Sequence, residues 1–352
     1  MPLRKFLINM DLRVSIKKNL RDFVLDVDFA VRDEIFALLG ASGCGKSITL
    51  KCIAGIETPD SGEIILNGRT LFNSAKKINL PPQARRAGYL FQNYALFPNM
   101  TVAENILFAA VGTASEKNRK LKENLSRFQL DGLENVYPSE LSGGQQQRVS
   151  FARVLTSHAE ILLLDEPFSA LDSYLKWQLE LELAEIFKIY GAAILVSHDR
   201  GEVYRLADKV AVMHNGTIST LDTKAEVFAH PKTLAAMLLT GCKNISPAQK
   251  ISNDKFFAKD WQLELTAKNI PDDLKFVGIH AATLEFRTDL DENTFAPEVI
   301  QIIEDTNFYI VMVRVNGGKA LRWEVDKNFW RNIQAAQILL HIPSEKIIMV
   351  SN

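Results

Sequence analysis

The sequence predicts an α/β fold built on a parallel sheet, followed by a small all-β domain. Continuous apolar runs at 35–39, 161–164 and 192–196 indicate strands that are buried on both faces, as in parallel sheets. An amphipathic pattern at 173–190 indicates a helix between two of them, and strands that alternate with helices are typical of a parallel sheet covered by helices. Beyond about residue 240 the pattern changes to short strands and turns.

The composition limits the class of protein. The chain has 352 residues, enough for two domains at about 150 residues each. Its 47% hydrophobic and 24% charged residues are ordinary globular usage, which excludes disorder as the dominant state. With 41 Lys and Arg against 42 Asp and Glu, the charge gives no support to a nucleic-acid partner. Three cysteines argue against a disulfide framework and suit a reducing cytosol.

No stretch approaches the roughly 20 apolar residues of a spanning helix, and residues 1–5 lack the apolar region of a signal peptide. We therefore expect the chain to be neither secreted nor embedded in a membrane, so that any membrane role comes through a partner.

Shorter elements are expected around the buried strands. Residues 23–31 alternate as a half-buried strand does, residues 62–66 form a short strand, and 101–137 are largely helical in pattern. The apolar face of the first of these carries Phe23, Leu25, Val27 and Phe29.

The second domain is expected to be a small β barrel or sandwich of about a hundred residues. Residues 308–315 are apolar on both faces, 316–318 indicate a hairpin turn, and 320–325 return as a strand. Two further strands are expected at 337–342 and 346–350.

A glycine-rich run carries the clearest chemical signal. Gly40-Ala41-Ser42-Gly43-Cys44-Gly45-Lys46-Ser47 matches the phosphate-loop pattern G-x-x-x-x-G-K-[ST] and lies between a buried strand and a helix-like apolar segment at 47–54. Together with Ile48, these residues are expected to bind the nucleotide. Its glycines permit a tight turn with exposed N–H groups above a helix N-terminus. We expect Lys46 to reach the β- and γ-phosphates of a nucleotide and the Ser47 hydroxyl to ligate Mg²⁺. A plain glycine turn with an exposed lysine is the alternative.

Cys44 lies inside this loop, where the nearby lysine and helix end favour a thiolate. The sequence predicts that alkylating reagents reach this thiol readily when no nucleotide is bound. The alternative is that Cys44 is only a small loop residue.

A second acidic site ends the apolar run at 161–164. We expect this strand beside the phosphate-loop strand, so that Asp165 reaches the Mg²⁺ ion. Glu166 then points to where an attacking water lies and acts as its general base. A strand that ends in a solvated acidic turn is the alternative.

One further motif names a family. Leu141-Ser142-Gly143-Gly144-Gln145-Gln146-Gln147-Arg148 precedes the acidic site by a short helix, and with both nucleotide motifs the chain resembles the ATP-binding cassette (ABC) ATPases of transporters. The resemblance implies a P-loop ATPase cassette with a helical subdomain. It also implies that Ser142, Gly143, Gly144 and the adjoining Gln145 bind the γ-phosphate held by a second copy. Two copies then pair head to tail, with ATP and Mg²⁺ between them.

Three more elements resemble the family in order. Gln92 resembles the glutamine that contacts Mg²⁺ and the water, and residues 169–172, ending in Asp172, resemble the loop that crosses the dimer interface. His198 resembles the switch histidine that contacts the γ-phosphate. One element departs from the pattern: the family's adenine-stacking aromatic falls near Leu20, and Phe23 is interpreted as a core-facing strand residue instead.

The resemblance implies membrane partners. Residues 94–98 are expected to expose an apolar, aromatic patch, and integral permease subunits are expected to dock near residues 92–98. The alternative is that 94–98 pack locally within the helical insertion. ATP then closes the dimer, the permease rearranges and hydrolysis resets the pair. A substrate-binding protein is an indirect partner. The chain is expected at the cytoplasmic face of the bacterial inner membrane.

The family resemblance sets the expected boundaries at 1–235 for the cassette, with its helical insertion at about 93–145, and 236–352 for an OB-like, TOBE-type accessory domain. Segments at 276–280, 302–306 and 321–325, with the linker 241–244, most resemble the molybdate and sulfate importers. That branch can bind its oxyanion in the C-terminal domain. The alternatives are a sulfate, sugar, polyamine or iron importer ATPase and, outside transport, another ABC ATPase.

Overall fold

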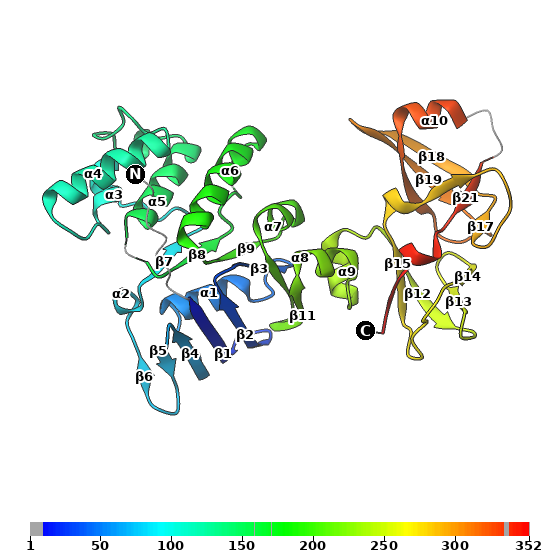
Figure 1. The fold of residues 1–352 in the computed structure, drawn as a ribbon, viewed down its shortest axis with the longest axis horizontal. Helices are drawn as coiled ribbons and strands as arrows, with labels where there is room; N and C mark the ends of the chain where they lie inside the picture. Colours follow the sequence, from blue (N-terminus) through cyan, green and yellow to red (C-terminus); the bar gives the residue numbers. More distant parts are fainter. Residues whose placement is uncertain (1–9, 158, 170, 334–337, 352) are drawn as a thin grey trace. The chain divides into compact units, whose positions relative to one another are not determined.

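The computed structural model describes residues 10–157, 159–169, 171–333 and 338–351. Two compact units follow each other along the chain, divided between Lys224 and Ala225 (Figure 1). The second unit begins with two short helices, α8 (Lys224–Ala229) and α9 (Leu234–Thr240). The boundary expected at 235/236 falls inside α9, later than the division in the structure.

The first unit is built on one mixed sheet with the strand order β6-β5-β4-β1-β2-β11-β10-β3-β9-β8-β7. The strands β10, β3, β9, β8 and β7 are parallel, and the others pair mainly antiparallel. In chain order the strands are β1 (Asp11–Asn19), β2 (Val24–Arg32), β3 (Ile35–Gly40), β4 (Ser61–Leu66), β5 (Arg69–Asn73), β6 (Ile78–Asn79), β7 (Ala87–Leu90), β8 (Ile161–Asp165), β9 (Ala193–Ser197), β10 (Lys209–His214) and β11 (Thr217–Thr223).

The parallel strands carry the continuous apolar runs. Every residue of β3, β8 and β9 is buried, because helices cover both faces of this part of the sheet. The strand β8 does not lie beside β3 as expected. The strand β9 lies between them, pairing Ile35 with Ala193 on one side and Leu162 with Ala193 on the other. Asp165 therefore approaches the phosphate loop across one intervening strand.

Helices of the first unit cover the sheet and extend beyond it on one side, where α3, α4 and α5 gather (Figure 1). Reciprocal caps start α3, α4 and α5: each begins at a Ser or Thr whose hydroxyl accepts from the third helical residue. The helices are α1 (Lys46–Ala54), α2 (Pro82–Arg85), α3 (Val102–Leu107), α4 (Ala114–Arg127), α5 (Gly143–Thr156), α6 (Ser173–Tyr190) and α7 (Arg200–Leu206), with a 3₁₀ turn η1 (Pro138–Glu140).

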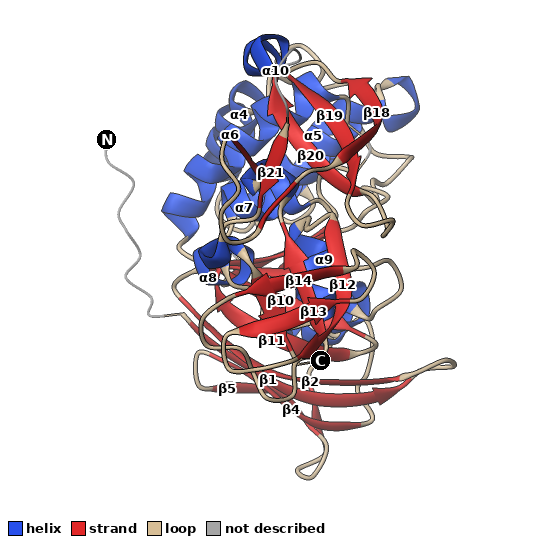
Figure 2. Cartoon of the chain, turned by 90° about the vertical axis from the view of Figure 1, so that its right-hand side faces the viewer, coloured by secondary structure: helices blue, strands red, loops and turns tan. Residues whose placement is uncertain are grey.

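The second unit is mainly β structure, which confirms the expected small all-β domain. Its strands form three sheets with the orders β14-β13-β12-β15-β22, β16-β21-β17 and β18-β19-β20. Figure 2 shows β18, β19 and β20 side by side, with α10 beside them. Trp323 and Trp330 meet edge to face in its core, with ring centroids 5.9 Å apart.

The elements of the second unit have the following bounds: β12 (Asn244–Lys250), β13 (Lys255–Ala258), β14 (Leu263–Thr266), β15 (Phe276–Ile279), η2 (Ala281–Thr283), β16 (Glu285–Arg287), β17 (Thr294–Phe295), β18 (Glu298–Glu304), β19 (Phe308–Arg314), β20 (Leu321–Asp326), α10 (Lys327–Ile333), β21 (Leu339–His341), η3 (Ser344–Lys346) and β22 (Ile348–Val350). The strand expected from residue 337 corresponds to β21, and residue 337 itself lies outside the described residues. Among the described helices of the chain, none combines the length and apolar character needed to cross a bilayer.

Candidate active site

The glycine-rich turn after β3 wraps around the start of α1. Gly43 and Gly45 have φ values of 80° and 109°, in the left-handed region that favours glycine. A Cβ on Gly40 would lie 2.6 Å from the Cys44 Sγ and 2.7 Å from the Met213 carbonyl oxygen, so this position excludes any side chain. The loop therefore presents backbone N–H groups and a helix N-terminus to one side, which is the arrangement that binds phosphate.

An open hollow of about 400 Å³ lies over this loop. Its walls come from four parts of the first unit: the turn before β2, the phosphate loop with α1, the segment after β7 and the end of β8. The lining residues are Leu20, Phe23, Ser42, Gly43, Gly45, Lys46, Ser47, Ile48, Gln92 and Glu166. The fold thus brings most of the predicted phosphate-loop residues and two of the predicted catalytic residues to one place.

Lys46 lies folded back across the loop. Its Nζ donates to the carbonyl oxygens of Gly40 and Ala41 at 2.7 and 2.8 Å, and the side chain is almost fully buried. These two carbonyls satisfy the ammonium group as a phosphate would. An incoming phosphate therefore competes with neutral acceptors, and its formal charge makes it the stronger partner.

Cys44 is buried, although its place in the loop predicts an accessible thiol. Only 7% of the residue is exposed, and its Sγ lies 3.9 Å from the Lys46 Nζ on the inner side of the loop. The small side chain fills the space that Gly40 leaves open. The structure supports the alternative of a packed loop residue and argues against easy alkylation.

Ser47 and Asp165 meet beside the phosphate loop. The Ser47 hydroxyl donates to Asp165 Oδ1 at 2.7 Å, and the Tyr89 hydroxyl donates to Asp165 Oδ2 at 2.8 Å. Serine and carboxylate oxygens are the hard ligands that Mg²⁺ prefers, and this ion usually completes its shell with substrate phosphates and water. No group of three or more metal-binding His, Cys, Asp or Glu side chains occurs among the described residues. The donor set therefore fits a nucleotide-linked Mg²⁺ ion better than a cage made by protein alone.

The three predicted catalytic side chains are also brought together. The Gln92 Nε2 donates to Glu166 Oε2 at 3.4 Å, and the His198 Nδ1 lies 3.2 Å from Glu166 Oε1. Glu166 has a φ of 48°, which is strained for a residue with a side chain, and its N–H donates to the Val196 carbonyl oxygen. This anchored, strained backbone directs the Glu166 carboxylate away from the sheet, so that it lies between Gln92 and His198.

Phe23 stands outside the strand that was predicted to contain it. The strand β2 begins at Val24, and the half-buried Phe23 ring lines the hollow together with Leu20. The ring covers Gly45: a Cβ there would lie 3.4 Å from the Phe23 Cε2 atom. Phe23 therefore lies just before the strand that was predicted to contain it, and its ring packs against the core as expected while also lining the hollow.

Replacing Phe23 by Ala is expected to weaken ATP binding by about tenfold, because an aromatic contact to a base contributes roughly 1–3 kcal/mol. Equilibrium titration with a fluorescent ATP analogue measures the change. Phe72→Ala is the matched control: this buried ring of the same sheet does not line the hollow, so the variant should lose stability and keep its affinity. Unchanged affinity in Phe23→Ala would exclude the base contact.

Ser142, Gly143, Gly144 and Gln145 form the start of α5. The Ser142 hydroxyl accepts from the Gln145 N–H at 3.3 Å, and Gln145 Oε1 accepts from the Ser142 N–H at 2.9 Å. The two glycines differ in their surroundings. A Cβ on Gly143 would meet no atom within 4 Å, whereas one on Gly144 would lie 3.1 Å from the Leu175 Cδ1. Gly144 therefore serves packing within the unit, and Gly143 leaves the helix start open on its outer side.

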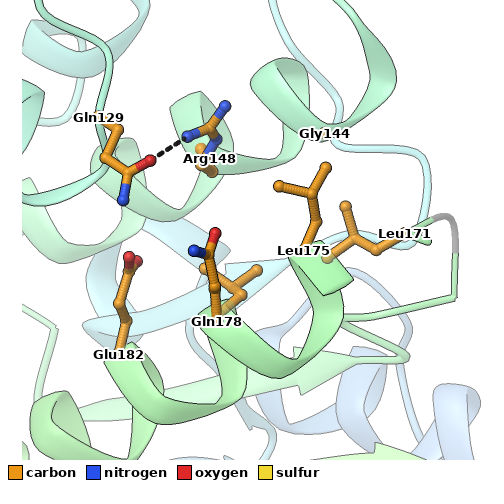
Figure 3. A pocket seen from close by; sticks show the side chains of 8 residues that line it. Gln129, Gly144, Arg148, Leu171, Leu175, Gln178 and Glu182 are labelled. Carbon is orange, nitrogen blue, oxygen red and sulfur yellow. Dashed lines mark hydrogen bonds between the residues drawn. The ribbon is translucent and has the colours of Figure 1, made fainter. Parts of the chain in front are cut away.

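Beneath this helix start, a small cavity of about 10 Å³ separates α5 from α6 (Figure 3). Arg148 reaches across its edge and donates to Gln129 Oε1 at 3.4 Å and to the Phe128 carbonyl oxygen at 3.2 Å. Burial raises the pKa of Glu182 on the opposite wall, and Arg148 and Arg127 partly offset that rise. The space admits about one water molecule, so it is a packing gap and not a nucleotide site.

Asp172 caps α6 and is not aimed at the phosphate loop. Its Oδ1 accepts from the N–H groups of Tyr174 and Leu175, both at 3.0 Å. The neighbouring Ala170 of the predicted interface loop lies outside the described residues. The Asp172 side chain is exposed, so the cap does not prevent contact with a second molecule.

Lys176 of the same helix holds the loop that carries His198. Its Nζ lies 2.6 Å from both Asp199 Oδ2 and Glu202 Oε1. Burial alone would lower the pKa of Lys176, but the hydrogen bonds to Asp199 and Glu202 outweigh it and raise this pKa. Burial would raise the pKa of Asp199, yet Lys176 and the capped N–H groups lower it overall.

Lys176→Met is expected to destabilise the first unit by about 2 kcal/mol at neutral pH, since it leaves the largely buried Glu202 without its cation. Because the pKa of Asp199 is lowered in the folded protein, its ion pair with Lys176 stabilises the fold fully above the ordinary carboxyl pKa. This stabilisation is lost as the pH falls through the lowered pKa. The penalty should therefore shrink in acid. Thermal unfolding measures it, with Lys188→Met as control because that ion pair with Glu185 is exposed. Equal losses in both variants would contradict the assignment.

Residues 94–98 are less exposed than expected. Tyr94 and Ala95 have positive φ values, and their carbonyl oxygens accept from the Arg153 guanidinium of α5 at 2.9 and 2.7 Å. Arg153 also lies over the Phe97 ring, 5.5 Å from its centroid. The segment is thus tied to the helix that begins at Gly143, and Pro98 is its exposed apolar residue. Two apolar side chains that the sequence analysis missed, Phe108 and Val111, are each 61% exposed close to this segment in the chain.

The fold and this loop match known proteins. The family model described as ABC transporter matches residues 25–169, within the first unit. A solved dimeric structure of a post-hydrolysis state of an ATP-binding cassette, bound to ADP and Pi, aligns with a TM-score of 0.53 and 24% identity. That alignment covers 61% of this chain and 98% of the solved one. The first unit is an ATP-binding cassette by fold.

Curated relatives match about two thirds of this chain at higher identity. An Fe(3+) ions import ATP-binding protein of Haemophilus influenzae is 42% identical over 235 residues, covering 65% of this chain and 66% of the relative. A spermidine/putrescine import ATP-binding protein of Methylococcus capsulatus is 42% identical, covering 65% of this chain and 58% of the relative. A sulfate/thiosulfate import ATP-binding protein of Synechocystis is 39% identical, covering 66% of each. The matched part is thus less than two thirds of the length of each of these relatives, from 58% to 66%.

The first unit also places two side chains against the predicted site residues that no sequence motif contains. Tyr89 contacts Asp165 from 76 positions away, and Lys176 reaches the loop around His198 from 23 positions away. Neither residue belongs to a contiguous motif. Only the arrangement of β7 beside β8 and of α6 beside α7 brings these groups together.

Proposed function

We propose that the chain is the ATP-hydrolysing subunit of an ABC importer. One observation carries the proposal: Gln92, Glu166 and His198 converge beside a phosphate loop whose Ser47 already meets Asp165. The test is ATP hydrolysis by the purified full-length chain, with phosphate release measured in the presence of Mg²⁺ and with EDTA. Absence of Mg²⁺-dependent hydrolysis, both alone and with its permease, would reject the proposal.

In the proposed reaction, a water held by Glu166 and Gln92 attacks the γ-phosphorus as the bond to the β–γ bridging oxygen breaks. Glu166 takes the proton of the attacking water, and ADP leaves with the bridging oxygen. Lys46 and the loop N–H groups stabilise the charge on the β- and γ-phosphate oxygens. His198 lies beside the Glu166 carboxylate and donates a ring N–H to a γ-phosphate oxygen. Mg²⁺ bound at Ser47 and Asp165 would neutralise part of the phosphate charge.

A second copy and two permease subunits are proposed as partners. The open outer side of Gly143 supports a head-to-tail pair in which Ser142 to Gln145 of one copy close on the nucleotide of the other. The exposed Phe108 and Val111, with Pro98, support docking of a short helix from an integral membrane subunit. The chain then works at the cytoplasmic face of the membrane. A substrate-binding protein lies on the other side and acts on the chain only through the permease.

The transported substrate is proposed to be an oxyanion, most specifically molybdate. The resemblance of the C-terminal segments to the molybdate and sulfate branch supports it, as does the sulfate/thiosulfate import relative. The Fe(3+) and spermidine/putrescine relatives support the other importers as alternatives, because they match a similar share of this chain at similar identity. A domain that binds an oxyanion can also inhibit the ATPase when the substrate is abundant.

The substrate proposal is tested on the full chain with molybdate, tungstate, sulfate, Fe(3+) and spermidine as probes. Equilibrium titration and ATPase assays should show that molybdate or tungstate binds or inhibits in the micromolar range. Inhibition by sulfate alone would favour the sulfate importer. Uptake of iron, a polyamine or a sugar by the reconstituted transporter, without any response to the oxyanions, would reject the oxyanion proposal while leaving the ATPase proposal intact.

A further inference from the structure

Two hydroxyl groups fix the Asp165 carboxylate from different sides. The Ser47 hydroxyl donates to Oδ1 at 2.7 Å and the Tyr89 hydroxyl donates to Oδ2 at 2.8 Å. Asp165 is only 4% exposed and Tyr89 only 9% exposed. A buried carboxylate needs such donors, because an unpaired buried oxygen has no water to replace them.

Tyr89 is held as rigidly as the carboxylate it contacts. It lies in β7, where it pairs with Leu163 of β8, two residues before Asp165. Its ring packs in the main core of the first unit and meets the Phe91 ring at a centroid distance of 4.5 Å. The Tyr89 hydroxyl is the donor in this contact, because an ionised carboxylate can only accept a hydrogen bond. The hydroxyl position is thus set by the sheet.

The two contacts have different roles in the proposed reaction. Ser47 lies at the start of α1 and becomes an ion ligand when nucleotide binds, while Tyr89 lies outside the residues that line the hollow. A carboxylate held by one partner can rotate about its Cβ–Cγ bond. A second donor on the other oxygen removes this freedom and keeps Oδ1 directed at Ser47.

We propose that Tyr89 is a positioning residue: its hydroxyl holds Asp165 so that Oδ1 and Ser47 together receive the Mg²⁺ of the bound nucleotide. The proposal rests on the proposed ATPase function. It assigns Tyr89 no contact with the ion or the nucleotide. The Tyr89 hydroxyl is expected to increase the amount by which Mg²⁺ raises nucleotide affinity, and equally the amount by which nucleotide raises Mg²⁺ affinity. Gln92 follows three residues after Tyr89, in the segment just beyond the end of β7.

The test compares nucleotide affinity with Mg²⁺ and with EDTA in the full-length chain, using a fluorescent ATP analogue without turnover. Tyr89→Phe keeps the ring and its packing and removes only the hydroxyl. In the unaltered chain Mg²⁺ should tighten nucleotide binding, and in Tyr89→Phe this gain should fall by about tenfold, as loss of one hydrogen bond to a charged group implies. Affinity in EDTA should stay the same. Electron paramagnetic resonance of Mn²⁺ in place of Mg²⁺ gives a second readout of the ion's affinity.

Two controls separate positioning from structure. Tyr137→Phe changes an exposed tyrosine of the same unit and should leave the Mg²⁺ gain unchanged. In a background of Asp165→Asn, Tyr89→Phe should have no further effect on this gain. A Tyr89→Phe variant that is less stable but retains the full Mg²⁺ gain would overturn the inference. If the unaltered chain shows no Mg²⁺-dependent nucleotide binding, the proposed function itself fails.

Discussion

Glu166→Gln is expected to leave ATP binding intact and to reduce turnover by about 10²–10⁴-fold, the usual contribution of a general base. The amide has the same shape as the carboxylate but cannot accept the proton of the attacking water. The contacts to Gln92 and His198 involve both oxygens of the side chain, so the variant keeps one acceptor for them. Phosphate release and equilibrium nucleotide titration measure the two effects separately.

The same variant should accumulate a closed dimer with ATP, because the step that opens the pair is blocked. Size-exclusion chromatography with ATP and Mg²⁺ detects this species. Glu185→Gln, on the exposed side of α6, is the control and should neither slow turnover nor trap a dimer. Turnover within a few-fold of the unaltered chain would mean that another group is the base, and the role of Glu166 would have to be withdrawn.

Contiguous motifs explain why so much of the site could be predicted. The phosphate loop, with its left-handed Gly43 and Gly45, is specified within eight residues, and the strand and helix around it are specified by local apolar patterns. The bounds of β3, β8 and β9 agree closely with the buried runs, because a strand covered on both faces leaves little choice of residue.

The order of the strands could not be predicted in the same way. We expected β8 beside β3, but β9 lies between them, since local patterns contain no information about which buried strand pairs with which. Long-range contacts were missed for the same reason. Tyr89 and Asp165 meet only because β7 and β8 pair in one particular register, and a shift by one residue would turn the hydroxyl to the other face.

Local patterns also predict the solvent exposure of side chains poorly. Cys44 was expected to be reactive from its position in the loop, yet the missing side chain of Gly40 creates the space in which the thiol is buried. Residues 94–98 were expected to be an exposed patch, yet Arg153 of α5 binds two of their carbonyl oxygens. In both cases the exposure of a segment depends on residues outside it that pack against it, and a local pattern does not contain these residues.

Gly143→Asp is expected to abolish ATP-driven pairing and to lower ATP turnover by at least about 100-fold, because a carboxylate would face the γ-phosphate of the other copy. Within one copy the change is harmless: a Cβ at this position meets no atom within 4 Å, and an acidic side chain suits a helix N-terminus. Melting temperature and nucleotide affinity of the separate copy should therefore be unchanged. Normal turnover in this variant would mean that the start of α5 does not contact nucleotide.

Mixing two inactive variants distinguishes a site shared between copies from a site within one copy. Lys46→Ala removes the phosphate-loop lysine, and Gly143→Asp blocks the start of α5. In a head-to-tail pair of one copy of each, the intact Lys46 of one copy faces the intact Gly143 of the other, so one of the two nucleotide sites is complete. We expect the mixture to trap ATP at this one site and to regain part of the turnover, whereas each variant alone stays inactive. If a site were built within one copy, every site in the mixture would lack one component, and no recovery could occur.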